Sequence, residues 1–170
     1  MTLSIRIGQG YDIHRLIPIK EGSEQETPLT LGGFGVPQAP FAVVAHSDGD
    51  VVLHALMDAL LGAMALGDIG DHFPPSNPAF AGANSQELLT QTLALLAQQG
   101  AAPVQMDATV VLEQPKLGPY KQAIRASLAQ LLQLPLSQVS FKAKTAEGLG
   151  PLGTSQAVAA SVTVLVQVCE

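Results

Sequence analysis

Cysteine and charged residues are both scarce in this sequence, and each scarcity excludes a class of protein. A single cysteine, Cys169, occurs among 170 residues, so neither a disulfide framework nor a cysteine-based metal site can form within the chain. This composition favours a reducing, cytoplasmic location. Only 13% of the residues are charged whereas 47% are hydrophobic, a low charge density for a small monomer. We therefore expect subunit interfaces to cover part of the apolar surface.

Basic residues and long hydrophobic runs are also lacking. Eight Lys and Arg against 14 Asp and Glu give a formal net charge of −6, which argues against a nucleic-acid partner. The richest apolar stretch, 51–66, is interrupted by His54 and Asp58, so we expect no membrane-spanning segment. We also expect neither a signal peptide nor a transit peptide at the N-terminus. The length predicts a single domain over residues 1–170.

Hydrophobic periodicity predicts one sheet combined with helices. The predicted strands cover residues 3–10 (continuing to Asp12 and His14), 104–112, 139–145 and 157–168, with a hairpin over 29–36 and a short apolar segment over 43–45. The predicted helices cover residues 48–66, 84–99 and 120–133, and a loop is expected over 20–28. This order predicts the α+β class, with one mostly β sheet and helices packed on one face.

Asp12, His14 and His54 are candidate metal ligands. Side chains two positions apart on a strand point the same way, so Asp12 and His14 can act together. His54 lies one turn inside a predicted helix. Two imidazoles and a carboxylate are a typical zinc ligand set that leaves a fourth position open. The alternative is three unconnected polar residues, because spacing alone does not show that the two segments meet.

The beginning of the first predicted helix offers further candidates. Asp50 and Asp58 lie four residues either side of His54, and either could accept a hydrogen bond from its imidazole; a solvated helix face is the alternative. Residues 46–49 lie at the start of the helix, where free N–H groups and the helix dipole favour a phosphate. The alternative is simple capping by Ser47 or Asp48.

Two later residues also allow two interpretations. Asp68 lies in a Gly-rich segment that ends the first helix, and it is either a turn residue or an acceptor for sugar hydroxyls. Glu147 follows a predicted strand and precedes a Gly-rich turn. It is either an exposed loop residue or a ligand for a hard cation such as Mg²⁺.

Taken together, these segments resemble the 2-C-methyl-D-erythritol 2,4-cyclodiphosphate synthase family over nearly the whole chain. The motifs that carry the resemblance are RIGQGYDIH (6–14), AHSDGD (45–50), HALMDALLG (54–62), ALGDIG (65–70), FP (73–74), QPK (114–116) and KAKTAEGLG (142–150). The block from His46 to Pro74 is too long for its match to be explained by chance. The family is a homotrimer with active sites between subunits, and the resemblance implies the same assembly here.

The resemblance also implies a role for each matching residue. Asp12, His14 and His54 would hold Zn²⁺, Glu147 would hold Mg²⁺ or Mn²⁺ together with substrate phosphates, and His46 and Thr145 would be catalytic. The implied substrate-binding residues are Asp12, His14, His46, Ser47, Asp68, Ile69, Gly70, Phe73, Pro74, Pro75, Ser76, Asn77, Leu112, Glu113, Gln114, Pro115, Lys116, Leu117, Gly118, Ala143, Lys144, Thr145, Ala146 and Glu147. Residues 112–118 and 143–145 would form the cytidine pocket from a neighbouring subunit.

The family reaction cyclises 4-diphosphocytidyl-2-C-methyl-D-erythritol 2-phosphate and releases CMP, so a small cytidine diphosphate compound is the implied substrate. Some positions depart from the family: Gly148 follows Glu147 where many members have Lys. Thr154 and Gln156 stand where many have an Arg and a Glu facing the central cavity of the trimer. Two other hypotheses are a catalytically silent trimer that binds cytidine nucleotides or isoprenoid diphosphates as a regulator, and a phosphodiesterase that uses zinc-bound water.

Overall fold

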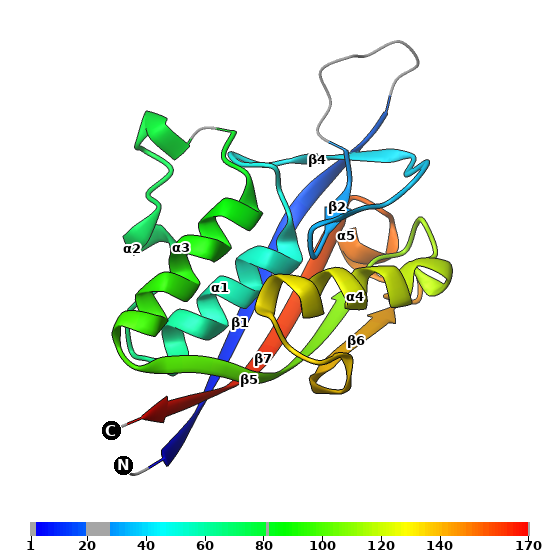
Figure 1. Ribbon diagram of the computed structural model, residues 1–170. Coiled ribbons are helices and arrows are strands. Elements are labelled where there is room, and N and C mark those ends of the chain that lie inside the picture. Colours follow the sequence, from blue (N-terminus) through cyan, green and yellow to red (C-terminus); the bar gives the residue numbers. More distant parts are fainter. Residues whose placement is uncertain (1–2, 20–27, 81, 170) are drawn as a thin grey trace.

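A five-stranded sheet, in the order β4-β1-β7-β5-β6, organises the chain (Figure 1). The structure is a computed structural model that describes residues 3–19, 28–80 and 82–169. Its strands are β1 (Leu3–Pro18), β4 (Phe41–Val44), β5 (Ala101–Val111), β6 (Val139–Lys144) and β7 (Ala157–Cys169). Neighbouring strands are antiparallel except β5 and β6, which are parallel. The predicted strands are thereby confirmed, although β1 extends beyond its predicted end.

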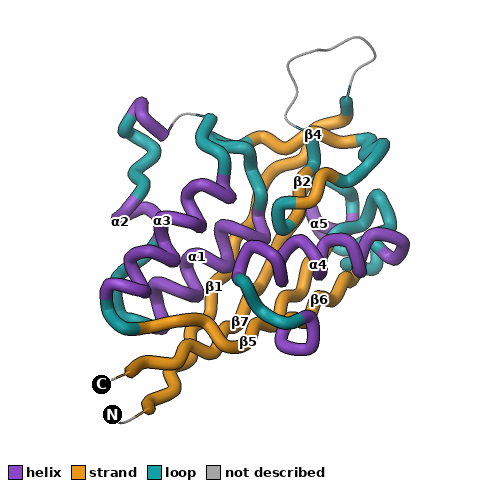
Figure 2. The backbone as a smooth tube through the Cα atoms, viewed as in Figure 1, coloured by secondary structure: helices purple, strands orange, loops and turns teal. Residues whose placement is uncertain are grey.

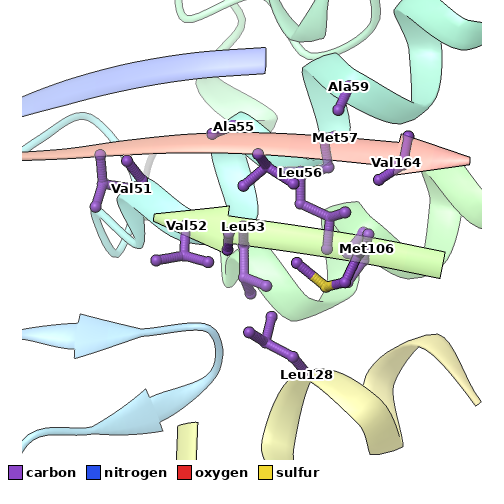
Figure 3. Packing of buried hydrophobic residues seen from close by; sticks show 14 of the residues in the cluster. Val51, Val52, Leu53, Ala55, Leu56, Met57, Ala59, Met106, Leu128 and Val164 are labelled. Atoms are coloured by element: carbon purple, nitrogen blue, oxygen red, sulfur yellow. The ribbon is translucent and has the colours of Figure 1, made fainter. Parts of the chain in front are cut away.

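Three helices pack against one face of this sheet, as predicted (Figure 1). They are α1 (Val51–Ala63), α3 (Ser85–Gln98) and α4 (Lys121–Leu132). The first is shorter than the predicted 48–66, because residues 48–50 precede the first helical turn and residues 64–66 leave the helix. The core lies between α1 and the sheet, where α1 side chains meet Met106 of β5, Val164 of β7 and Leu128 of α4 (Figure 3).

The opposite face of the sheet is apolar along β1. Odd-numbered residues point there, and Ile5, Ile7, Tyr11 and Ile13 are each about half exposed or more. Even-numbered residues of the same strand face the helices, including Gly8, Gly10, Asp12 and His14. Strand β1 therefore turns its polar candidate ligands towards α1 and leaves a hydrophobic strip uncovered.

Short elements complete the fold (Figure 2). The predicted hairpin is confirmed as β2 (Thr30–Leu31) and β3 (Phe34–Gly35), joined by Gly32 and Gly33. The segment after α1, predicted to be irregular, contains the single-turn helix α2 (Ile69–His72) and the 3₁₀ turn η1 (Pro78–Phe80). The remaining short helices are η2 (Gly118–Tyr120), η3 (Leu136–Gln138) and α5 (Gly150–Gly153). Most of the predicted loop 20–28 lies outside the described residues.

Within the part of the chain that the structure describes, no helix combines the length and the apolar character needed to cross a membrane.

Candidate metal centre

Asp12, His14 and His54 meet where β1 packs against the start of α1. The Oδ2 atom of Asp12 lies 2.9 Å from Nδ1 of His54 and 3.1 Å from Nε2 of His14. The two ring nitrogens are 2.9 Å apart. The three ligand atoms therefore form a nearly equilateral triangle, although His54 is 40 residues from His14 in the chain.

This triangle fits a zinc ion. Zinc binds imidazole nitrogen and carboxylate oxygen at about 2.0–2.2 Å, which places neighbouring ligand atoms of a tetrahedral site roughly 3.3 Å apart. The observed separations of 2.9–3.1 Å are close to that value. The side chains of Asp12, His14 and His54 are 25%, 16% and 12% exposed, so the site is shielded but open on one side. The donor set thus suits a metal with one free coordination position.

The electrostatics favour a charged ligand at Asp12. Burial raises the pKa of this carboxyl, but its contacts with His14 and His54 outweigh that effect and hold the pKa well below its usual range. The second carboxylate oxygen, Oδ1, accepts the N–H of Ile13 at 2.8 Å. Asp12 is therefore ionised and fixed in orientation at neutral pH, as a metal ligand requires.

The residues around His54 correct two sequence predictions. Helix α1 is capped by Asp50, whose Oδ1 accepts the N–H groups of Val52 and Leu53 at 3.1 Å each. Capping by Ser47 or Asp48 is therefore wrong, and two N–H groups that a phosphate would use are occupied. The interpretation in which the His54 imidazole bonds to Asp50 or Asp58 is also wrong. The contacts of its ring nitrogens are with Asp12, His14, Ser47 and Ser85, and Asp58 accepts the N–H of Ile69 at 2.8 Å.

Asp50 has a structural role instead. Its carboxylate is fully buried and also accepts the N–H groups of Gly32 and Gly33, at 2.9 and 2.7 Å. Burial raises its pKa to about 6, and these amide hydrogen bonds oppose that rise. The side chain therefore joins the β2–β3 turn to the first turn of α1.

A cavity of about 260 Å³ opens beside the metal ligands. It contains many of the residues that the sequence assigned to the substrate. Its lining includes His14, His46, Ser47, His54, Ile69, Gly70, Phe73 and Pro75, with Phe80 and Leu88 as apolar members that the sequence did not predict. Pro74, Ser76 and Asn77 lie in the same connection between α2 and η1. The cavity therefore combines an apolar wall with polar groups near the metal ligands, as is typical of small-molecule sites.

Asp68 begins the helix at the edge of this cavity. Its Oδ1 accepts the N–H of Asp71 at 3.1 Å, and Asp71 Oδ2 accepts the N–H of Asp68 in return, forming a capping box. The prediction of a plain turn residue is therefore wrong. Because the cap uses only one oxygen of the carboxylate, the other remains suited to a sugar hydroxyl.

The second set of predicted residues gathers towards the opposite edge of the sheet, where β5 and β6 end. A cavity of about 240 Å³ is lined by Leu112, Lys116, Leu117, Gly118, Lys121, Ala143, Lys144 and Thr145. Lys121 was not predicted to lie in this cavity, because nothing in the sequence shows that the first residue of an amphipathic helix lines a pocket. Lys116 pairs with Glu113 at 3.0 Å, and this contact lowers the pKa of Glu113. The Thr145 hydroxyl donates to Glu147 at 2.5 Å.

The two cavities share no lining residue. Strands β1 and β6 are separated by β7 and β5 in the sheet, and three strand spacings amount to roughly 14 Å. Within one chain the predicted residues therefore form two clusters. Asp12, His14, His46 and His54 belong to the first, and Lys116 and Thr145 belong to the second.

Ser85 also belongs to this site, although no sequence motif predicts it. This residue is fully buried at the start of α3, and its Oγ lies 3.0 Å from Nε2 of His54. The only sequence signal was its place after the capping residue Asn84, which predicts a helix start but no contact with the metal ligands.

An α+β domain with a candidate Asp-His-His metal centre beside a largely apolar cavity is the arrangement expected of a metal-dependent enzyme. The chain belongs to the YgbB family, whose model matches residues 5–167. A protein of Thermosynechococcus vestitus named 2-C-methyl-D-erythritol 2,4-cyclodiphosphate synthase is 50% identical over 165 residues, covering 97% of this chain and 98% of that protein. One of Symbiobacterium thermophilum with the same name is 49% identical, covering 94% and 97%.

Solved structures agree with this assignment. A structure of 2C-methyl-D-erythritol-2,4-cyclodiphosphate synthase in its CDP-bound form matches with a TM-score of 0.82 and 41% identity, covering 95% of this chain and 99% of that chain. The IspF–CDP complex of Plasmodium falciparum matches with a TM-score of 0.81 and 33% identity, covering 95% of each chain. The family resemblance predicted from sequence motifs is confirmed.

Proposed function

We propose that this chain converts 4-diphosphocytidyl-2-C-methyl-D-erythritol 2-phosphate to 2-C-methyl-D-erythritol 2,4-cyclodiphosphate and CMP, a step of non-mevalonate isoprenoid biosynthesis. The supporting observation is that the chain has the Asp12–His14–His54 cluster and also matches, over nearly its whole length, relatives that bear the name of this enzyme. The reaction is a phosphorus–oxygen lyase reaction. An oxygen of the 2-phosphate attacks the β-phosphorus, and the bond from that phosphorus to the oxygen bridging it to CMP breaks.

The chemistry needs no strong protein base, because the attacking oxygen is already anionic. Catalysis then depends on positioning and on neutralising charge. Zinc, when held by Asp12, His14 and His54, supplies a Lewis acid for the β-phosphate. His46 and Ser47 line the cavity beside these ligands, where their side chains can orient the reacting phosphates. The apolar wall that includes Phe73 and Pro75 excludes water from the methylerythritol end.

Thr145 and Glu147 would serve the nucleotide diphosphate. Glu147 follows β6 with a left-handed backbone (φ 52°) and already accepts the Thr145 hydroxyl. An exposed carboxylate of this kind suits Mg²⁺ or Mn²⁺, which bind one or two carboxylates together with phosphate oxygens. The cavity with Lys116 and residues 143–145 would take the cytidine, and Asp68 with Gly70 would bind the ribose hydroxyls. The CDP complexes of related proteins support a cytidine ligand.

We further propose a homotrimer with each active site between two subunits. Two observations support it: the clusters around His14 and around Thr145 line separate cavities, and the open face of the sheet exposes Ile5 and Ile7 at 59% and 69%. An apolar strip of this kind is typical of a subunit contact. The assembling unit would be one domain over residues 1–170, in the cytoplasm. Thr154 and Gln156 would then face the trimer axis without the Arg of many relatives.

Phosphorus NMR of the purified protein with the diphosphocytidyl substrate, zinc and Mg²⁺ tests the proposal. We expect the resonances of a cyclic diphosphate together with an equimolar amount of CMP, both abolished by a chelator. A linear hydrolysis product would indicate a phosphodiesterase. An unchanged spectrum from folded, metal-loaded protein would indicate a silent nucleotide-binding protein, and either result would overturn the proposal.

A further inference from the structure

Ser85 connects a half-buried carboxylate to a proposed metal ligand. Its hydroxyl lies 2.5 Å from Oδ1 of Asp48 on one side and 3.0 Å from Nε2 of His54 on the other. Its side chain has no exposed surface. The three groups come from the β4–α1 connection, the start of α3 and the first turn of α1, so the fold brings them together from separate elements.

The direction of each hydrogen bond in this chain of contacts can be deduced. Asp48 acts as an acceptor throughout: its carboxylate also receives the N–H groups of Ser85 at 2.8 Å and of Asp50 at 3.3 Å. Both oxygens of Asp48 already accept N–H groups, so the single hydroxyl proton of Ser85 points towards Asp48. The Ser85 oxygen can then only accept from His54. The proton of the His54 ring therefore lies on Nε2.

In the neutral ring, which is the form that binds a metal, a proton on Nε2 leaves the lone pair of His54 on Nδ1. That atom faces Oδ2 of Asp12 at 2.9 Å and Nε2 of His14 at 2.9 Å. A lone pair opposite a carboxylate oxygen is two acceptors facing each other, and a cation between them satisfies both. The contact with Ser85 thus prepares the form of His54 that binds a metal.

We propose that Ser85 and Asp48 are positioning residues for the metal centre. They hold the His54 ring in the tautomer and orientation in which Nδ1 is a ligand. Ser47 also lies 3.1 Å from Nε2 of His54, but it lines the cavity beside the metal ligands, whereas Ser85 is fully buried and does not line that cavity. This proposal rests on the zinc site of the proposed function and does not depend on the cyclisation reaction.

Zinc affinity of the full-length protein is the first test. Groups that orient a metal-bound histidine typically change metal affinity by about 10–100-fold, and we expect a loss in that range for Ser85→Ala in a competition titration at fixed pH. Thr92→Val is the matched control, because Thr92 is an equally buried hydroxyl on the same helix whose partner is the carbonyl of Leu88. It should bind zinc as the wild type does. Equal affinity in Ser85→Ala and wild type would overturn the proposal.

A second measurement distinguishes positioning from general support of the fold. In zinc-loaded wild-type protein labelled with ¹⁵N-histidine, the Nε2–H proton of His54 should exchange slowly with water because Ser85 accepts it. Ser85→Ala should accelerate this exchange, because the proton loses its buried acceptor, while Thr92→Val should not change it. Rapid exchange in the wild type would overturn the proposal even if every variant failed to fold.

The Asp48 contribution can be separated by a double-mutant cycle. Asp48→Ala frees the Ser85 hydroxyl to donate to His54 and should also weaken zinc binding. Because both residues act through one chain of hydrogen bonds, the losses in the double variant should not multiply. Independent losses would overturn the role of Asp48. If the wild type binds no zinc, the proposed function itself fails. If the wild type binds zinc and Ser85→Ala binds it equally well, only the role of Ser85 fails.

Discussion

Gly10 and Ala55 lie in such close contact that a side chain at Gly10 has no room. A Cβ atom there would lie 2.0 Å from the backbone carbonyl oxygen of Ala55. Gly8, one step earlier on the same face, has the same relationship with Ala59 at 1.8 Å. Strand β1 and helix α1 therefore approach backbone to backbone, and the neighbouring ligands Asp12 and His54 come within bonding distance of one ion.

We predict that Gly10→Ala moves α1 away from β1. The added methyl group meets backbone atoms that cannot rotate away, so we expect a loss of at least about 3 kcal/mol in the free energy of unfolding, at the upper end for overpacking. Zinc affinity should fall as well, because Asp12 and His54 separate. Urea unfolding and a zinc competition titration measure the two effects.

Gly62→Ala is the control for this prediction. Gly62 is on α1, and apart from its own helix backbone an added Cβ would meet nothing within 4 Å, so the change should stabilise the helix by about 0.5–1 kcal/mol. Equal stability of Gly10→Ala and Gly62→Ala would show that the close approach is unimportant.

The elements of the fold could be predicted from the sequence, but this close contact between β1 and α1 could not. The strands and long helices follow from periodicity, and each half of the metal site is visible as a local motif. The meeting of Asp12 with His54 depends on two glycines on the helix-facing side of β1, and a Gly in a strand can equally mark a bulge or a bend. The contact of Ser85 with His54 depends on the packing of α3 and has no local signal.

We predict that His54→Ala removes the bound zinc. The variant deletes one of three ligands, and the remaining Asp12 and His14 cannot close the site, so metal content should fall from near one per chain to near zero and cyclisation should be lost. His72→Ala is the control, because His72 contacts the carbonyl of Leu66 at 2.8 Å and lies outside the triad. Wild-type metal content in His54→Ala would refute the assignment.

We predict that Asp50→Ala destabilises the fold without touching a proposed ligand. Four N–H groups lose their acceptor, two of them in the buried first turn of α1, and each unsatisfied buried group costs about 1–3 kcal/mol. From that range, a total loss of at least about 3 kcal/mol is expected in urea unfolding. Asn84→Ala, which removes one exposed capping acceptor, should cost only about 1 kcal/mol.

The titration of the Asp50 carboxyl should also contribute to the pH dependence of the free energy of unfolding. The pKa of Asp50 rises from 3.8 to about 6 on folding, so between these values the native state holds a proton that the unfolded chain has lost. Its contribution to stability is therefore full below about pH 4 and decreases as the pH rises through 6. Asp50→Asn should lack this component. Parallel pH profiles of unfolding free energy in the two proteins would contradict the shift.

The last prediction separates the two roles of Asp68, which caps α2 and is proposed to bind the ribose. Asp68→Ala should weaken CDP binding by about 1–3 kcal/mol, the cost of a lost hydrogen-bond acceptor, as measured by calorimetry. Asp71→Ala breaks the same capping box from its other side and should leave CDP affinity within a few-fold of wild type. If both variants lose affinity equally, the helix cap alone accounts for the effect. Unchanged affinity in Asp68→Ala would remove this residue from the nucleotide site.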